Sequence, residues 1–193
     1  LSTIKSRCQK LSFSSVNEAD LAAVLATIGC KVNQTEENAL HILSQGSAGA
    51  ACRLINSNCI NLYKDILNIT SSLPTLNINK TLQLNQDYFA KAKSNNFEIF
   101  FEMMQQFFSR LCKTGVMQSP ILPSVSMEEE KIMTYLCPSP ESAYLWSEAA
   151  NITLAKLNKG YFLNINIESL IMDAFIYLEK CYKTISQNTV TNE

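Results

Sequence analysis

The sequence lacks any apolar run of the roughly 18–20 residues that a membrane-spanning helix needs. It also has no N-terminal apolar stretch with a small-residue cleavage site, so we expect neither a membrane anchor nor a signal peptide. An excess of one charge is missing too, because 16 Lys and Arg face 17 Asp and Glu, a formal net charge of −1. Such a chain has no bulk attraction for nucleic acid or anionic membranes. We therefore expect a cytoplasmic protein without direct DNA binding.

Histidine is almost absent, since His41 is the only one, and the seven cysteines include no Cys-x-x-Cys pair. A structural zinc site needs a full set of nitrogen or sulfur ligands, so we expect no metal site. The odd cysteine count argues against a secreted disulfide scaffold and favours free thiols that pack as small apolar side chains. Without a partner histidine or clustered acids, His41 is expected to be a hydrogen-bonded or solvent-facing residue rather than a base or ligand.

Signatures of catalysis are missing as well. The sequence has no phosphate-binding Gly-x-x-x-x-Gly-Lys-Ser/Thr loop, nucleophile elbow, dinucleotide fingerprint or pair of catalytic carboxylates. Its one dense acidic group is Glu128, Glu129 and Glu130. We interpret this group as the exposed acidic first turn of a helix, because negative charge is favourable there. We expect no enzyme activity from this chain alone, and no cofactor bound by it.

What the sequence does contain is one helical pattern after another, within a composition of 47% hydrophobic residues. Apolar residues recur at helical spacing, and glycines, prolines and polar caps separate the segments. The expected helices cover about residues 18–28, 35–45, 48–55, 59–67, 79–93, 96–114, 127–136, 140–160 and 167–185, with a frayed tail over 186–193. No segment alternates convincingly with the period of a strand. The sequence predicts an all-α protein.

Several residues predict where these helices begin and end. Ser15 with Glu18, and Ser126 with Glu129, match the Ser-x-x-Glu capping box. Ser139-Pro140 combines a hydroxyl cap with proline at the first helical position. Gly115 and Gly160 are placed as helix ends.

The segment 96–114 is dense in aromatic residues, with five phenylalanines. An apolar set this wide is typical of a helix that is buried on most of its circumference. The alternative is a base-stacking platform for single-stranded nucleic acid, but no Lys or Arg is interleaved before Arg110. We therefore expect this helix to serve core packing or a subunit interface.

The run Thr3-Ile4-Lys5-Ser6-Arg7-Cys8-Gln9 resembles the Ser-Arg-Cys motif of clamp-loader subunits of the AAA+ superfamily. In that family the motif closes the nucleotide-binding domain, so the resemblance implies the C-terminal half of a larger protein. Gln45-Gly46-Ser47-Ala48-Gly49-Ala50-Ala51 is similar to the start of the third helix of the family's lid. The stretch from Trp146 through Asn164-Ile165-Asn166 to Glu179 is a looser match to the family's collar.

The resemblance implies three parts: residues 1–13 as the end of the AAA+ module, 14–58 as a three-helix lid, and 59–193 as a helical collar. The collar would comprise five or six helices, and in this family it assembles the subunits into a ring. Arg7, flanked by Ser6 and Cys8, would be an arginine finger acting in trans, because its planar guanidinium suits a γ-phosphate. An ordinary surface arginine is the alternative.

Three further residues refine this interpretation. Gly49 stands where ATP-hydrolysing subunits carry a sensor arginine, and this favours the delta-prime type, which does not hydrolyse ATP. Arg53, one turn later, is expected to be solvated or to pack against a helix. Cys8 lacks a nearby base, and we expect it to pack against the lid.

The implied protein is a non-hydrolysing subunit of the DNA polymerase III clamp loader in DNA replication, and so part of a nucleotidyltransferase holoenzyme. Its implied partners are gamma/tau-type and delta subunits and, indirectly, the sliding clamp and primed DNA, with ATP bound by the partner subunits. The competing hypotheses are a gamma/tau-type ATPase subunit, a free-standing helical protein-interaction module and a single-stranded nucleic-acid binder.

Overall fold

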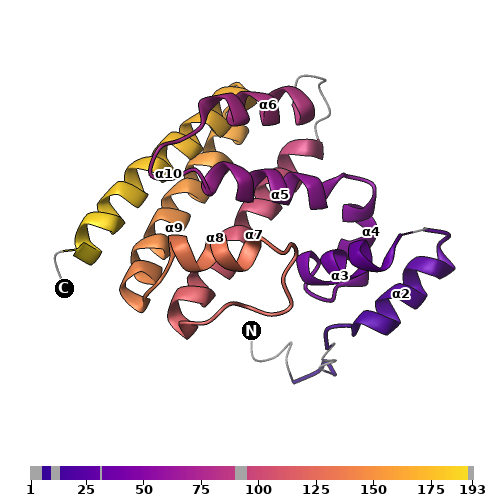
Figure 1. Ribbon diagram of the computed structural model, residues 1–193. Helices are drawn as coiled ribbons and strands as arrows, with labels where there is room; N and C mark the ends of the chain where they lie inside the picture. Colours follow the sequence, from indigo (N-terminus) through magenta and orange to yellow (C-terminus); the bar gives the residue numbers. More distant parts are fainter. Residues whose placement is uncertain (1–5, 10–13, 31, 90–94, 191–193) are drawn as a thin grey trace.

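The computed structural model describes residues 6–9, 14–30, 32–89 and 95–190. Within these residues it is helical and contains no strand, which confirms the predicted all-α class (Figure 1). The helices are α2 (Glu18–Thr27), α3 (Gln34–Leu43), α4 (Ala48–Ile55), α5 (Cys59–Thr70), α6 (Ile78–Tyr88), α7 (Asn95–Met117), α8 (Glu129–Leu136), α9 (Pro140–Phe162) and α10 (Ile167–Val190).

Polar caps begin most of these helices, although not always at the predicted residue. Ser139 caps α9 with Pro140 at its first position, as expected. The box predicted at Ser15 is wrong, because Asn17 caps α2 by accepting the Asp20 N–H. The chain is still extended at Asn17 (φ −72°, ψ 168°), so the helix starts after it.

The box predicted at Ser126 is wrong as well. The residue before α8 is Glu128, and it makes no side-chain capping bond. The Glu129 side chain points into the protein, where it accepts hydrogen bonds from Arg110 and Tyr63 rather than reaching back to Ser126. At Glu129, hydrogen bonds with the buried side chains of Arg110 and Tyr63 therefore take the place of the predicted capping bond.

Two glycines predicted as helix ends lie inside helices instead. α7 continues past Gly115 to Met117, and α9 continues past Gly160 to Phe162. A Cβ on Gly115 would overlap the Cys137 sulfur, and one on Gly160 would overlap the Leu170 side chain. Both glycines therefore allow close packing between neighbouring segments, which a propensity rule cannot anticipate.

Two other helix ends also differ from the prediction. α6 ends at Tyr88, and residues 90–93 of the predicted helix lie outside the described residues. The last helix continues to Val190, so the expectation of a frayed segment from 186 onward is wrong up to that residue, and 191–193 lie outside the described residues.

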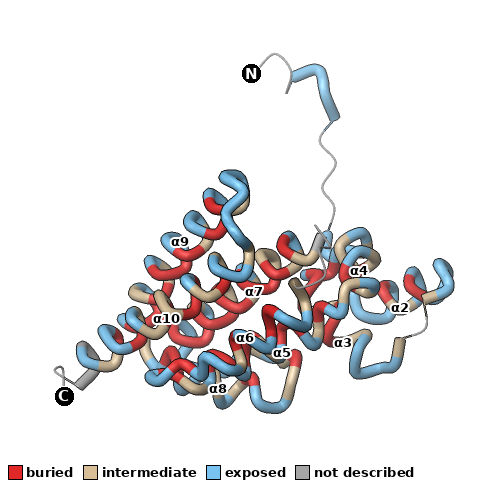
Figure 2. Tube along the Cα trace, turned by 90° about the horizontal axis from the view of Figure 1, so that it is seen from above, coloured by how far each residue is buried: buried red, intermediate tan, exposed pale blue. Residues whose placement is uncertain are grey.

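The long helices α7, α9 and α10 make the main packing layer, with α7 against α9 and α9 against α10 (Figure 1). α5 packs on α7, and α6 packs on both α5 and α10. Trp146, Phe100, Phe107 and Phe175 are fully buried. Figure 2 shows red, buried stretches along α7, α9 and α10. Phe97, Phe100, Phe107 and Phe108 of α7 are buried and Phe101 is partly buried, which confirms the expectation that this helix serves core packing.

The short helices α2, α3 and α4 pack on one another at the N-terminal side of this layer (Figure 1). Their buried residues include Leu21, Leu25, Leu40, Leu43 and Leu54. We call this unit, residues 14–57, the three-helix unit. Its helices match the three short helices that the sequence predicts over these residues.

Candidate functional site

Arg7 lies in a short exposed turn formed by residues 6–9 (Figure 2). Its guanidinium is therefore accessible to another molecule, as an arginine acting in trans must be. Cys8 is also exposed, so the expectation that it packs against the lid is wrong. The chemistry expected of Arg7 stays a prediction. Residues 3–5 of the motif-bearing run lie outside the described residues.

Gly49 occupies the first turn of α4, whose N-terminal cap is Ser47. The Ser47 hydroxyl accepts the Ala50 N–H at 3.3 Å. Gly49 is exposed, and a Cβ built on it would meet no atom within 4 Å. Packing would therefore admit a larger residue here. Glycine has no side chain that could contact a phosphate at this position.

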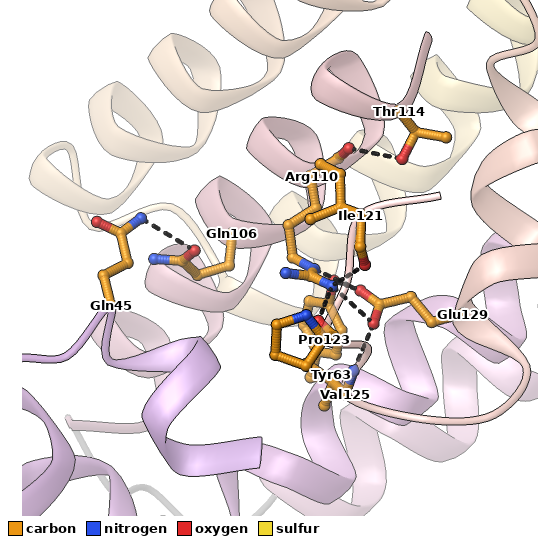
Figure 3. Close-up of polar contacts among 9 residues, drawn as sticks. All are labelled: Gln45, Tyr63, Gln106, Arg110, Thr114, Ile121, Pro123, Val125 and Glu129. Atoms are coloured by element: carbon orange, nitrogen blue, oxygen red, sulfur yellow. Dashed lines mark hydrogen bonds and ion pairs between the residues drawn. The ribbon is translucent and has the colours of Figure 1, made fainter. Parts of the chain in front are cut away.

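Two polar contacts join the three-helix unit to α7. The Gln45 amide donates a hydrogen bond to Gln106 Oε1 at 3.2 Å, as Figure 3 shows. Arg53 Nη2 lies 3.8 Å from Glu102 Oε1, and 71% of the Arg53 side chain is exposed. This pair is screened by water and contributes little stability. It confirms the expectation of a solvated, helix-packing arginine.

His41 is hydrogen-bonded, as expected, because its Nε2 lies 2.9 Å from the Val16 carbonyl oxygen. A carbonyl only accepts, so Nε2 must carry the hydrogen. That nitrogen is engaged with the backbone and cannot act as a general base.

The acidic group on α8 departs most from the prediction. Glu129 is only 2% exposed, so the expected exposed acidic turn is wrong at this residue. Its carboxylate accepts two hydrogen bonds from Arg110, Nε to Oε1 at 2.7 Å and Nη2 to Oε2 at 3.1 Å (Figure 3). Tyr63 donates to Oε1 at 2.7 Å, and the Val125 N–H donates to Oε2 at 2.6 Å. We call Tyr63, Arg110 and Glu129 the buried clasp.

The buried clasp holds the loop between α7 and α8. Arg110 Nη2 donates to the carbonyl oxygens of Ile121 and Pro123, at 3.3 and 2.9 Å. Burial and the neighbouring Glu129 carboxylate raise the pKa of Tyr63 well above its ordinary value, so it stays a donor at neutral pH. Every charge in the clasp is paired, which makes it a structural element rather than a reactive one. The signal in the sequence that could have predicted the clasp is Arg110, a lone arginine on the apolar face of α7.

The cysteines are free, and two of them, Cys59 and Cys137, are buried. Burial raises the pKa of Cys59 and of Cys112 to about 11, so both remain protonated, poor nucleophiles at neutral pH. Cys59 lines a hollow of about 460 Å³ between the three-helix unit and the start of α5. Glu36 and Lys64, which also line it, are exposed.

Among the residues that the structure describes, no three His, Cys, Asp or Glu side chains come together as metal ligands. None of the described helices is long and apolar enough to cross a membrane. The chain matches no model of a known protein family, no curated protein and no solved structure.

Proposed function

We propose that this chain belongs to a non-hydrolysing, delta-prime-type subunit of the DNA polymerase III clamp loader. The proposal rests on the order in which three structural parts follow one another along the chain. An exposed turn with Ser6, Arg7 and Cys8 is followed by three short helices and then by a layer of long helices. The third short helix begins after Gly46-Ser47, as the lid helix of the resembled family does.

In this function Arg7 reaches an ATP molecule that a neighbouring gamma/tau-type subunit binds. Its fixed charge and paired donors would stabilise the charge that develops on the γ-phosphate. Helices α5–α10 would form the collar that joins the ring, together with a delta subunit. The ring would open the sliding clamp and close it on primed DNA.

Gly49 favours the delta-prime type over a gamma/tau-type ATPase. A Cβ at this position would meet no atom within 4 Å, yet the residue present has no side chain. Burial of four of the five phenylalanines of α7, Phe97, Phe100, Phe107 and Phe108, disfavours a binder of single-stranded nucleic acid that uses this helix. A free-standing interaction module is the outcome if no ring forms.

The test uses the protein produced from its complete coding sequence and reconstituted with its own gamma/tau-type and delta subunits. Gel filtration measures ring assembly, and DNA-stimulated ATP hydrolysis measures the finger. Arg7→Ala should assemble normally but lose turnover at the adjacent ATP site, because a finger contributes on the order of 10³–10⁵ in rate there.

Arg7→Lys should be nearly as inactive as Arg7→Ala, since lysine restores the charge without the planar pair of donors. Arg53→Ala, which removes another exposed arginine, is the matched control and should hydrolyse as the unmodified protein does. Undiminished hydrolysis by Arg7→Ala would remove the finger from the proposal. Failure of the unmodified protein to join the ring would refute the clamp-loader function itself.

A further inference from the structure

Helix α2 is apolar on its exposed side as well as on its buried side. Leu21 and Leu25 are buried, as the inner positions of a surface helix are. The opposite side carries two rows of residues at i, i+4 spacing, and all of them are exposed: Ala19, Ala23 and Thr27 in one row, and Asp20, Val24 and Ile28 in the other. We call these six residues the α2 stripe.

The α2 stripe lacks the polar side chains that normally cover the outer face of a surface helix. Asp20, in the first turn, is its one charged residue. Val24 is 38% exposed and Ile28 is 53% exposed. α2 packs on α3 and α4 and lies at the edge of the molecule (Figure 1, Figure 2). A helix with apolar residues on all sides is typical of a buried helix, so we expect the stripe to have a partner.

The apolar surface continues past the end of α2. Gly29, Cys30 and Val32 follow the stripe in the chain and line the hollow of about 460 Å³ beside the start of α5. Ile55 of α4 and Ile60 of α5 belong to the same lining. A partner that lies along α2 would therefore also reach the hollow.

The charge beside the stripe is mostly of one sign. α2 and α3 carry four carboxylates, Glu18, Asp20, Glu36 and Glu37, and no Lys or Arg. The last turn of α2 has no basic residue, so no side chain of that turn offsets the negative end of the helix dipole. Among the residues that line the hollow, Lys64 of α5 is the one cation. Positive charge on a partner is therefore favoured along α2 and α3.

We propose that the α2 stripe and the adjoining hollow bind a helix of a partner protein that is apolar on one face and carries Lys or Arg beside that face. Ala19 and Ala23 are small and let such a helix approach closely. Val24 and Ile28 supply the apolar contact, and Asp20 pairs with one of its cations. An amphipathic helix that lays its apolar face on a matching surface is a common mode of recognition. The proposal goes beyond the proposed function and does not depend on it, because this binding needs no other ring subunit.

Two synthetic peptides serve as probes, each of about 18 residues, so that an isolated helix can form. Both carry leucine and alanine on one helical face, whereas the other face has lysine in one peptide and glutamate in the second. Fluorescence anisotropy of the labelled peptides measures binding to the whole chain. The lysine peptide should bind at least about tenfold more tightly at low salt, and added salt should reduce this difference. Hydrogen exchange of the α2 amides should slow when the lysine peptide is bound.

Two variants remove the binding surface in different ways. Val24→Ser combined with Ile28→Ser removes the apolar contact without changing a charge, and it should weaken binding of the lysine peptide at least about tenfold. Ala23→Arg adds bulk and positive charge at an exposed position with a good helix former, so it should fold normally and also prevent binding. Phe162→Ser is the matched control, because it removes an apolar side chain that is 75% exposed at the end of α9, and it should bind as the unmodified protein does.

Tighter binding of the lysine peptide, weakened by the serine pair and by Ala23→Arg but not by Phe162→Ser, supports the proposal. Equal binding of the two peptides, no binding of either, or unchanged binding by Ala23→Arg would overturn it. Self-association of the protein alone that Ile28→Ser abolishes would overturn it as well, because a second copy would then cover the stripe. Ring assembly enters none of these measurements, so the proposed function stands or fails separately.

Discussion

Replacing Arg110 with methionine should test whether the buried clasp is a major source of stability. The change keeps much of the side-chain volume but removes two bonds to Glu129 and two to carbonyls of the 121–123 loop. The Glu129 carboxylate, 2% exposed, would keep only Tyr63 and Val125 as donors. Removing one partner of a buried ion pair costs about 3–5 kcal/mol, because the other charge stays buried without compensation.

The loss should be measured by urea unfolding, monitored through the fluorescence of Trp146. The midpoint should fall while the dependence on urea stays the same, since the surface exposed on unfolding is unchanged. Arg53→Met is the matched control, because Arg53 also pairs with a glutamate, Glu102, but is mostly exposed. We expect it to cost less than about 1 kcal/mol.

A double variant tests whether the uncompensated charge of Glu129 causes the loss of stability. Adding Glu129→Leu to Arg110→Met removes the uncompensated charge, so part of the stability should return. Recovery should stop short of the original value, because the Tyr63 hydroxyl and Val125 N–H then lack a partner, at about 1–3 kcal/mol each. If Arg110→Met costs no more than Arg53→Met, the argument from burial is refuted.

Two further predictions concern Gly46 and Cys59. Gly46→Ala should destabilise the protein by at least about 1 kcal/mol, because alanine is strained at the left-handed φ and its Cβ would clash with Val16. Thermal unfolding measures this loss. Gly49→Ala is the control, because Gly49 is exposed and a Cβ there would meet no atom within 4 Å. The Cys59 thiol has its pKa raised from 9.0 to about 11, so the folded state holds a proton that the unfolded state loses between these values. Stability should therefore decline as pH rises from 9 to 11, and Cys59→Ala should reduce that decline in urea midpoints measured across this range. An equal decline in the alanine variant would rule out Cys59 as its source.

The helices were predictable because their signals are local. Apolar spacing and polar caps predicted each described helix near its observed position, and Ser139-Pro140 predicted the start of α9. The errors came where a distant partner decides the outcome. Gly115 and Gly160 look like helix ends in isolation, yet close packing against Cys137 and Leu170 keeps them inside helices.

In the candidate site, too, local signals were predictable from the sequence and contacts with distant residues were not. The absence of partner groups predicted that His41 would be hydrogen-bonded or solvent-facing rather than a base, but its acceptor, Val16, lies 25 positions away and could not be named. Glu129 was misplaced because an acidic first turn is usually exposed. Only the fold brings Arg110 and Tyr63 to it, across 19 and 66 positions of sequence.

The buried clasp and the exposed contacts between the three-helix unit and α7 differ in how firmly they hold the segments that they join. The buried clasp is largely shielded from water and joins α5, α7 and the loop before α8 by hydrogen bonds. The contacts from the three-helix unit to α7 are exposed and few, and each contributes under about 1 kcal/mol. These polar contacts alone would not hold the unit against α7. Its attachment to the long helices comes mainly from apolar packing, because Leu43 and Leu54 belong to the same buried core as α5 and α7, and α3 packs on α5.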